Sequence, residues 1–151
     1  KEETSIINDK NYESGLVNES NFLSKKEIFD SITSRLKGLN YRIGLLIQDY
    51  KVDMVINGDI IIQVRAHKAP TTSEKFIVYD AIKLTSLIEG GSARMAYIVI
   101  YGRFSKKFQD QLKSGELLKD VNISPKVRII GYDEFLALLE SEEFRSFTYH
   151  R

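Results

Sequence analysis

The stretch that decides the fold runs from Lys51 to Lys68 and reads KVDMVINGDIIIQVRAHK. Two short apolar runs rich in β-branched residues, Val52–Ile56 and Ile60–Val64, flank the dipeptide Asn57-Gly58. Asn-Gly between two such runs is typical of a tight β-hairpin turn. The stretch is therefore predicted to form a β-hairpin.

The alternation of side chains along the two runs predicts the register of this hairpin. A turn of Asn57-Gly58 alone would place Asp53 in an apolar layer with Ile62, where an ionised carboxylate is costly. One extra residue in the connection instead pairs Ile56 with Ile60 and sets Asp53 opposite Gln63. We expect this odd-numbered connection. It would gather Asp53, Gln63 and Arg65 on one polar face and Val52, Met54, Ile56, Ile60, Ile62 and Val64 on the other.

Periodicity and caps predict the elements around the hairpin. Ser24-Lys25-Lys26-Glu27 matches a capping box, in which each side chain satisfies a free amide of the first helical turn. The expected elements are a helix at 24–37, a strand at 41–47, a helix from about 74 with Phe76, Ile77, Ala81, Leu84, Leu87 and Ile88 inward, a strand at 95–101, a helix from Phe104 running into Leu117-Leu118, a strand at 127–130 and a helix at 133–139.

This order predicts an α/β fold with a central mixed sheet flanked by helices, antiparallel in the hairpin and parallel in the strand–helix–strand half. It is an α-β-β-β-α-β core with an added helix-strand-helix. We expect an irregular N-terminal arm over 1–20, which is polar and lacks periodicity, and one domain over 21–151.

The composition excludes several chemistries. The chain has no cysteine and two histidines, so disulfides, thiol catalysis and cysteine–zinc sites are excluded and a His-rich metal site is not expected. Its net charge of +1 gives no overall attraction to nucleic acid, so any such affinity must come from a local patch. No apolar run is long enough to span a bilayer. We expect a cytoplasmic protein without a membrane partner.

With its polar residues in place, the element order resembles the PD-(D/E)xK nucleases, which have the restriction-endonuclease-like fold and include archaeal Holliday-junction resolvases. The resemblance covers roughly residues 24–131. The family's strand Asp falls on Asp53, its helix Glu on Glu27, its Glu/Asp position on Gln63 and its Lys position on Arg65. The resemblance implies Mg²⁺- or Mn²⁺-dependent hydrolysis of DNA by an endonuclease of the restriction or repair and recombination type.

The last two positions depart from the family pattern, giving D…QxR in place of D…(D/E)xK. A neutral Gln oxygen can bind Mg²⁺ but brings no charge to offset the ion's dehydration. Arg stays protonated, so Arg65 cannot act as a general base, although it can stabilise charge on phosphate. The expected metal ligands are therefore Asp53 and Gln63 with help from Glu27 or Asp80, and the expected catalytic residues are Asp53, Gln63, Arg65 and Lys68, the last as a displaced base.

Basic residues in several segments would form a phosphate-contacting surface if the fold brought them together. They are Lys25, Lys26, His67, Lys68, Lys83, Arg103, Lys106 and Lys107. Expected partners are DNA and, from the resemblance, a second copy of the chain or another nuclease or recognition subunit.

Two functions remain open from the sequence. One is an active nuclease with an atypical site; the other is a catalytically degenerate nuclease fold that binds DNA or a partner. Metal binding separates them, because only the first needs a divalent cation.

Overall fold

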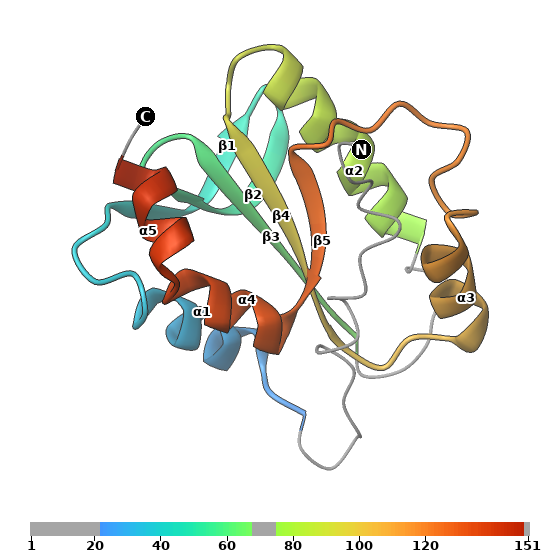
Figure 1. The fold of residues 1–151 in the computed structure, drawn as a ribbon, viewed down its shortest axis with the longest axis horizontal. Coiled ribbons are helices and arrows are strands. Elements are labelled where there is room, and N and C mark those ends of the chain that lie inside the picture. Colours follow the sequence, from blue (N-terminus) through green and yellow to red (C-terminus); the bar gives the residue numbers. More distant parts are fainter. Residues whose placement is uncertain (1–21, 68–74, 150–151) are drawn as a thin grey trace.

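The computed structural model describes residues 22–67 and 75–149, with only the backbone described for 147–149. Its centre is one five-stranded sheet in the order β1-β2-β3-β4-β5 (Figure 1). The predicted arm at 1–20 lies outside the described residues. The strands are β1 (Tyr41–Ile47), β2 (Tyr50–Ile56), β3 (Ile60–His67), β4 (Met95–Gly102) and β5 (Val127–Gly131).

The central hairpin has the predicted register. Strands β2 and β3 are antiparallel with Ile56 opposite Ile60. Asn57 and Gly58 adopt left-handed conformations with φ of 56° and 78°, and the Asp59 amide donates to the Ile56 carbonyl at 3.2 Å. Asp59 is thus the extra residue after a closed Asn-Gly turn. The Arg94 Nε donates to the Asp59 carboxylate at 2.9 Å and fixes this residue against the chain before β4.

The second half of the sheet is parallel, as predicted. Strand β4 lies between β3 and β5, and both pairings are parallel. Helix α2 (Phe76–Glu89) connects β3 to β4, and α3 (Lys106–Ser114) lies between β4 and β5. From Ala96 to Gly102 every residue of β4 is buried, which is expected of a parallel strand covered on both faces.

Two helix predictions need correction, and one helix was not predicted. Helix α1 (Lys25–Thr33) has the full capping box at Ser24 but ends before residue 37. Helix α3 ends at Ser114, is capped by Gly115, whose φ of 90° suits glycine, and does not run into Leu118. After the expected helix α4 (Tyr132–Leu139), a further helix, α5 (Glu142–Tyr149), was not predicted.

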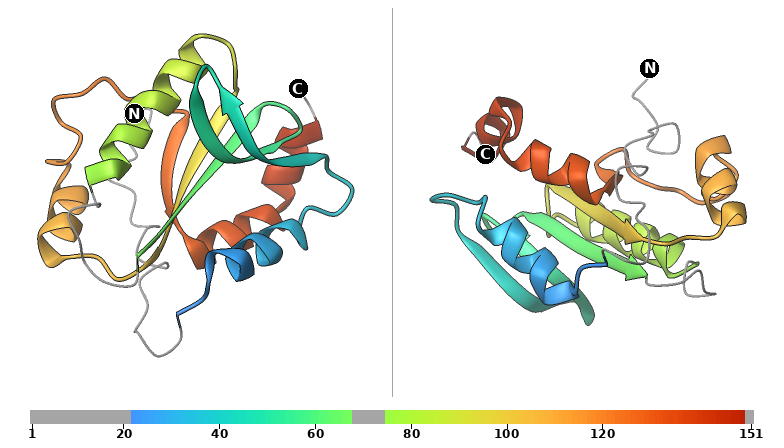
Figure 2. Two further views of the ribbon diagram at one scale, coloured as in Figure 1. Left: turned by 180° about the vertical axis from the view of Figure 1, so that it is seen from behind. Right: turned by 90° about the horizontal axis from the view of Figure 1, so that it is seen from below.

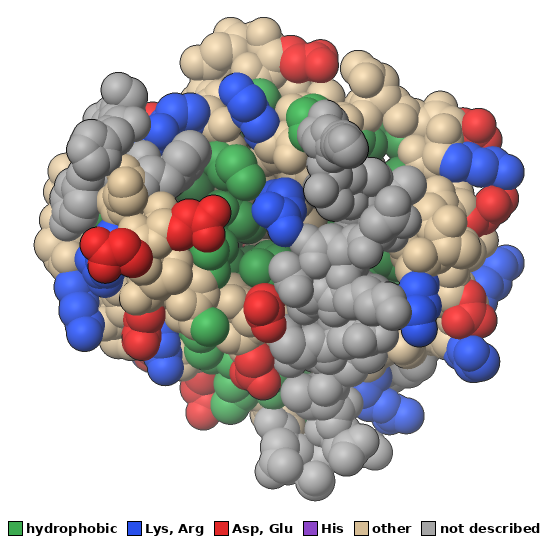
Figure 3. All heavy atoms as spheres, in the orientation of Figure 1, with side chains coloured by type: hydrophobic (Ala, Val, Ile, Leu, Met, Phe, Trp, Pro, Cys, Tyr) green, Lys and Arg blue, Asp and Glu red, His purple; other side chains and the backbone are tan. Residues whose placement is uncertain are grey.

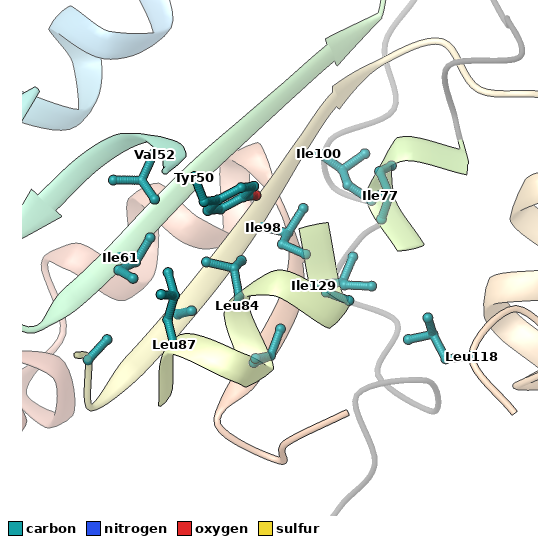
Figure 4. Packing of buried hydrophobic residues seen from close by; sticks show 14 of the residues in the cluster. Tyr50, Val52, Ile61, Ile77, Leu84, Leu87, Ile98, Ile100, Leu118 and Ile129 are labelled. Carbon is teal, nitrogen blue, oxygen red and sulfur yellow. The ribbon is translucent and has the colours of Figure 1, made fainter. Parts of the chain in front are cut away.

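Helices cover the sheet on both faces and create two apolar layers (Figure 2). Helix α2 packs on one face through Ala81 and through Ile77 and Leu84, which Figure 4 shows. Helices α1 and α4 pack on the other face, where Ile28 and Phe135 are completely buried. We call these the α2 layer and the α1–α4 layer.

The alternation of β2 breaks at Asp53, which corrects the predicted apolar face. Met54 lies in the α1–α4 layer as expected, whereas Val52 lies with Val55 in the α2 layer. Opposite Asp53 in the β1–β2 register stands Gly44, whose φ is +71°. A left-handed residue of this kind bends an extended strand, and glycine adopts it without steric cost. Strand β2 therefore changes the layer that it faces at this point, whereas β3 keeps Ile60, Ile62 and Val64 in the α1–α4 layer.

A recess of about 630 Å³ lies over β4 and β5 beside α4 and α5 (Figure 3). Its lining combines apolar side chains such as Tyr97 and Leu138 with Arg128 and Glu143.

Burial raises the pKa of Tyr97 to about 12. Within residues 22–67 and 75–149, none of the helices has the length and apolar character needed to cross a bilayer.

Candidate functional site

The side chains of Asp53 and Gln63 hydrogen-bond β2 to β3 beyond the point where the backbone pairing of the two strands ends. The last paired residues are Met54 and Ile62. Beyond them the Asp53 amide donates to Gln63 Oε1 at 2.7 Å, and the Val64 amide donates to Asp53 Oδ2 at 2.7 Å. Each side chain thus replaces a backbone acceptor of the neighbouring strand. These bonds give Asp53 and Gln63, two polar side chains among apolar residues, a structural role.

Gln63 also begins a buried polar chain that reaches α2. Its Nε2 donates to the Tyr50 hydroxyl at 3.0 Å and to the Lys51 carbonyl at 3.2 Å. The Tyr50 hydroxyl in turn donates to Asp80 Oδ1 at 2.6 Å. Burial, and next the hydrogen bond to Asp80, raise the pKa of Tyr50 well above its ordinary value. Tyr50 therefore stays a neutral hydrogen-bond donor throughout the physiological pH range.

Asp80 ends this chain in a two-pronged pair with Arg65. Arg65 Nε lies 2.5 Å from Oδ2 and Nη2 lies 2.8 Å from Oδ1. The Asp80 side chain is completely buried, whereas the Arg65 side chain keeps 30% exposure. Hydrogen bonding to Asp80 is the largest cause of a raised pKa of Arg65. Arg65 remains a cation and cannot accept a proton from water.

The polar groups do not line one surface, which corrects the expectation from the hairpin register. Asp53 Oδ1 lies 3.3 Å from Lys25 Nζ of α1, on the side of the α1–α4 layer. Gln63 instead contacts Tyr50, which belongs to the α2 layer. The physical reason is the bend at Asp53. It places the Asp53 and Gln63 side chains between the two strands, where each accepts a hydrogen bond from the backbone of the other strand.

These residues do not fit a Mg²⁺ or Mn²⁺ ion. Such cations need several oxygen ligands with negative charge. Asp53 is matched by Lys25 and Asp80 by Arg65, while Glu27 Oε1 accepts the Ser24 amide in the capping box. Across the described part of the chain, no three His, Cys, Asp or Glu side chains gather as a metal-binding group. Lys68, the expected displaced base, lies outside the described residues.

The expected nucleic-acid-binding residues divide between one end of the sheet and α2. Strands β3 and β4 are parallel, and their last residues, His67 and Gly102, lie side by side. The segments that lead into α2 and α3 therefore leave the sheet at the same end. The Leu23 amide donates to the Tyr101 hydroxyl at 2.8 Å, which brings the start of α1 there too. This carboxyl end of β3 and β4 therefore collects Lys25, Lys26, His67, Arg103, Lys106 and Lys107.

Several of these residues already have partners. Lys26 and Lys106 pair with Asp30 and Asp110 one turn later in their helices. The His67 ring packs on Phe104 with centroids 4.6 Å apart, and the Arg103 amide donates to the His67 carbonyl at 2.8 Å. Lys83, in contrast, lies along α2, with Nζ 6.0 Å from the Tyr79 ring centroid.

Sequence reasoning missed four residues around Arg65. Nothing in the sequence indicated that Tyr50 belongs to the polar network, because an aromatic residue at the end of a strand is usual in any hydrophobic core. Phe76 was expected to point inward but is 50% exposed, and Tyr79 is 51% exposed. Their spacing of three along a helix was the available signal, since it places both on one face. Lys75, just before α2, lies beside them.

The comparisons with known proteins give no family. No protein-family model matches the chain, and no curated protein matches it. Among solved structures, the crystal structure of a protein of unknown function, AF1548, is similar at 15% identity with a TM-score of 0.42. The alignment covers 70% of this chain and 58% of that chain. A likeness of this size carries neither a fold family nor an activity to this protein.

Proposed function

We propose that this chain is a restriction-endonuclease-like domain that binds nucleic acid and does not hydrolyse it. The proposal of fold rests on an antiparallel β1-β2-β3 meander followed by α2 and a parallel β4, the order of elements that the resemblance implies. Asp53, Gln63 and Arg65 stand on the strands where the nuclease family holds its catalytic residues. Their contacts, however, are those of a structural network.

The observation that carries nucleic-acid binding is the cationic end of the sheet. Basic residues of α1 and α3 lie toward the carboxyl ends of β3 and β4, and the exposed ion pairs of Lys26 and Lys106 are weak enough for phosphate to replace the carboxylates. In open α/β sheets, ligands bind outside the carboxyl ends of the strands. The end of β5 differs, because α4 starts there with exposed Asp133 and Glu134. A polyanion would therefore follow β3 and β4 and avoid β5.

The absence of hydrolysis follows from charge balance. A divalent cation bound between Asp53 and Asp80 would meet Arg65 and Lys25, which already neutralise both carboxylates. Asp80 is completely buried and bonded on both oxygens, so freeing it would strand a buried charge. This cost opposes the assembly of a metal centre at these residues.

Metal-dependent cleavage remains a second candidate for one specific reason. Asp53 keeps 18% side-chain exposure, and its partner Lys25 is 53% exposed. Exposed ion pairs are weak, at about 1 kcal/mol or less, so a cation could displace Lys25 from Oδ1. This candidate predicts that Asp53 is required for any cleavage.

The binding test is fluorescence anisotropy of a labelled duplex across a series of salt concentrations in EDTA. We expect affinity to fall with salt, as counterion release requires. Lys107→Glu should weaken binding and lower the salt slope by about 1. Lys126→Glu is the matched control, because Lys126 is exposed just before β5, at the opposite end of the sheet. Equal losses in the two variants, or no binding by the wild type at low salt, would contradict the proposal.

The cleavage test is nicking of supercoiled plasmid with Mg²⁺ or Mn²⁺. We expect intact plasmid under conditions in which anisotropy reports binding. Metal-dependent nicking that Asp53→Asn abolishes would replace the proposal with the second candidate.

A further inference from the structure

A cleft beside the Arg65–Asp80 pair combines exposed aromatic rings with cations. It has a volume of about 480 Å³ and is lined by Arg65, Lys75, Phe76 and Tyr79. Pockets of this size accept ligands as large as a nucleotide. The cleft lies on the α2 side of the sheet and uses none of the cations at the starts of α1 and α3.

The two rings are available for stacking. Phe76 and Tyr79 are 50% and 51% exposed and lie on one face of the first turns of α2. The Tyr79 ring packs edge-on against Tyr50 with centroids 6.1 Å apart, so the buried network steadies it. Half-exposed aromatic rings are the platforms on which single-stranded nucleic acids stack their bases, at about 1–3 kcal/mol per base.

Cations flank both rings. Arg65 Cζ lies 6.0 Å from the Phe76 centroid, and Lys83 Nζ lies 6.0 Å from the Tyr79 centroid. Arg65 uses Nε and Nη2 of its guanidinium for Asp80, and within the part of the chain that the structure describes its Nη1 group remains for a ligand. Because Asp80 balances the charge of Arg65, the net positive charge comes from Lys75 and Lys83.

We propose that this cleft binds an unpaired nucleotide, with its base stacked on Phe76 and Tyr79 and its phosphate held by Arg65 and Lys75, while Lys83 beside Tyr79 attracts the neighbouring phosphate of the strand. The inference rests on the proposed nucleic-acid binding and gives it a substrate class, single-stranded nucleic acid. A duplex fits less well, because its bases already stack on one another and cannot reach the rings. A protein partner would account for the rings but not for cations on both sides of them.

The test uses a single-stranded 12-mer carrying one 2-aminopurine, whose fluorescence falls when the base stacks. We expect quenching by the wild type. Phe76→Leu/Tyr79→Leu should remove the quenching and weaken single-strand binding between about 5-fold and about 100-fold. Duplex binding should change by less than about twofold. Phe76→Leu alone gives a milder form of the same loss and leaves the Tyr50–Tyr79 contact in place.

The control is Tyr41→Leu, because Tyr41 is also a half-exposed aromatic residue but lies on β1. It should leave quenching unchanged. A further arm adds AMP as a competitor: displacement of the 12-mer at millimolar AMP would identify a free nucleotide as sufficient, and its absence would show that an extended strand is needed. Either result is compatible with the shared chemistry of base and phosphate.

Two results with a wild type that binds the 12-mer would overturn the inference. One is single-strand binding without quenching; the other is equal loss of duplex and single-strand binding in the leucine variants. Duplex binding by a wild type that ignores the 12-mer would overturn the inference and leave the proposed function standing. Failure to bind either nucleic acid would overturn both.

Discussion

Arg65 donates two hydrogen bonds to Asp80, at 2.5 and 2.8 Å, although Asp80 is completely buried and Arg65 remains 30% exposed. One partner of this pair has lost its water, while the other keeps part of its hydration. A buried carboxylate is tolerated only when its charge is compensated and its oxygens are bonded. Arg65 and Tyr50 supply both conditions, so the pair anchors α2 to β3.

Removing the cation from this pair should be strongly destabilising. Among the described residues, Arg65→Ala leaves buried Asp80 with only the Tyr50 hydroxyl as a partner, and we expect a loss of about 3–5 kcal/mol in the free energy of unfolding. Urea denaturation measures it. The double variant Arg65→Met/Asp80→Leu removes both charges and should recover most of the loss. Lys83→Ala, which removes a different cation of the same region, is the control. If Arg65→Ala were as stable as this control, the Arg65–Asp80 pair would contribute little to the free energy of unfolding.

Tyr50→Phe should break the buried polar chain in its middle. The change keeps the ring but removes the hydroxyl that accepts from Gln63 and donates to Asp80. Two buried groups then lose a partner, and we expect a loss of about 1–3 kcal/mol by urea denaturation at pH 7. Tyr41→Phe, at an exposed position, is the matched control and should change stability by less than about 0.5 kcal/mol.

Alkaline pH should destabilise the protein through its buried tyrosines. The pKa of Tyr97 is raised to about 12 by burial, and that of Tyr50 is raised as well. A raised pKa favours the neutral phenol of the folded state, so the stabilisation is complete below about pH 10 and is lost as pH rises through the folded pKa. Each of the two tyrosines should lower the free energy of unfolding by about 1 kcal/mol between pH 10 and 11. Tyr97→Phe should flatten the decline; an unchanged slope would contradict this assignment.

Gly44→Ala should test the bend at Asp53. A Cβ at Gly44 meets no atom within 4 Å, so the cost comes only from its φ of +71°. We expect a loss of about 1–2 kcal/mol. Faster amide hydrogen exchange in β1 and β2 should accompany it. Leu46→Ala is the control on the same strand, because Leu46 is 71% exposed. A neutral Gly44→Ala would mean that the strand tolerates a straight path here.

The sequence alone determined the order of elements, the mixed sheet and the register of the central hairpin. These features depend on local information. The capping box at Ser24 fixes where α1 begins, and the cost of a carboxylate in an apolar layer chooses between two registers of β2 and β3. The buried run of β4 reflects cover on both faces. Each signal is contained within a few neighbouring residues.

The tertiary structure decided what the polar residues do. No local signal pairs Asp80 with Arg65 or places Tyr50 between Gln63 and Asp80, because these contacts join segments that meet only after the sheet and α2 have packed. The bend opposite Gly44 places Val52 in the α2 layer. It also leaves Asp53 in contact with Lys25 of α1, whereas Gln63 contacts Tyr50 in the α2 layer. Phe76 fits an inward helical pattern in the sequence, yet it lies exposed beside Arg65. The charge of a site is a sum over such distant neighbours, and in this fold Lys25 and Arg65 are the neighbours that balance Asp53 and Asp80.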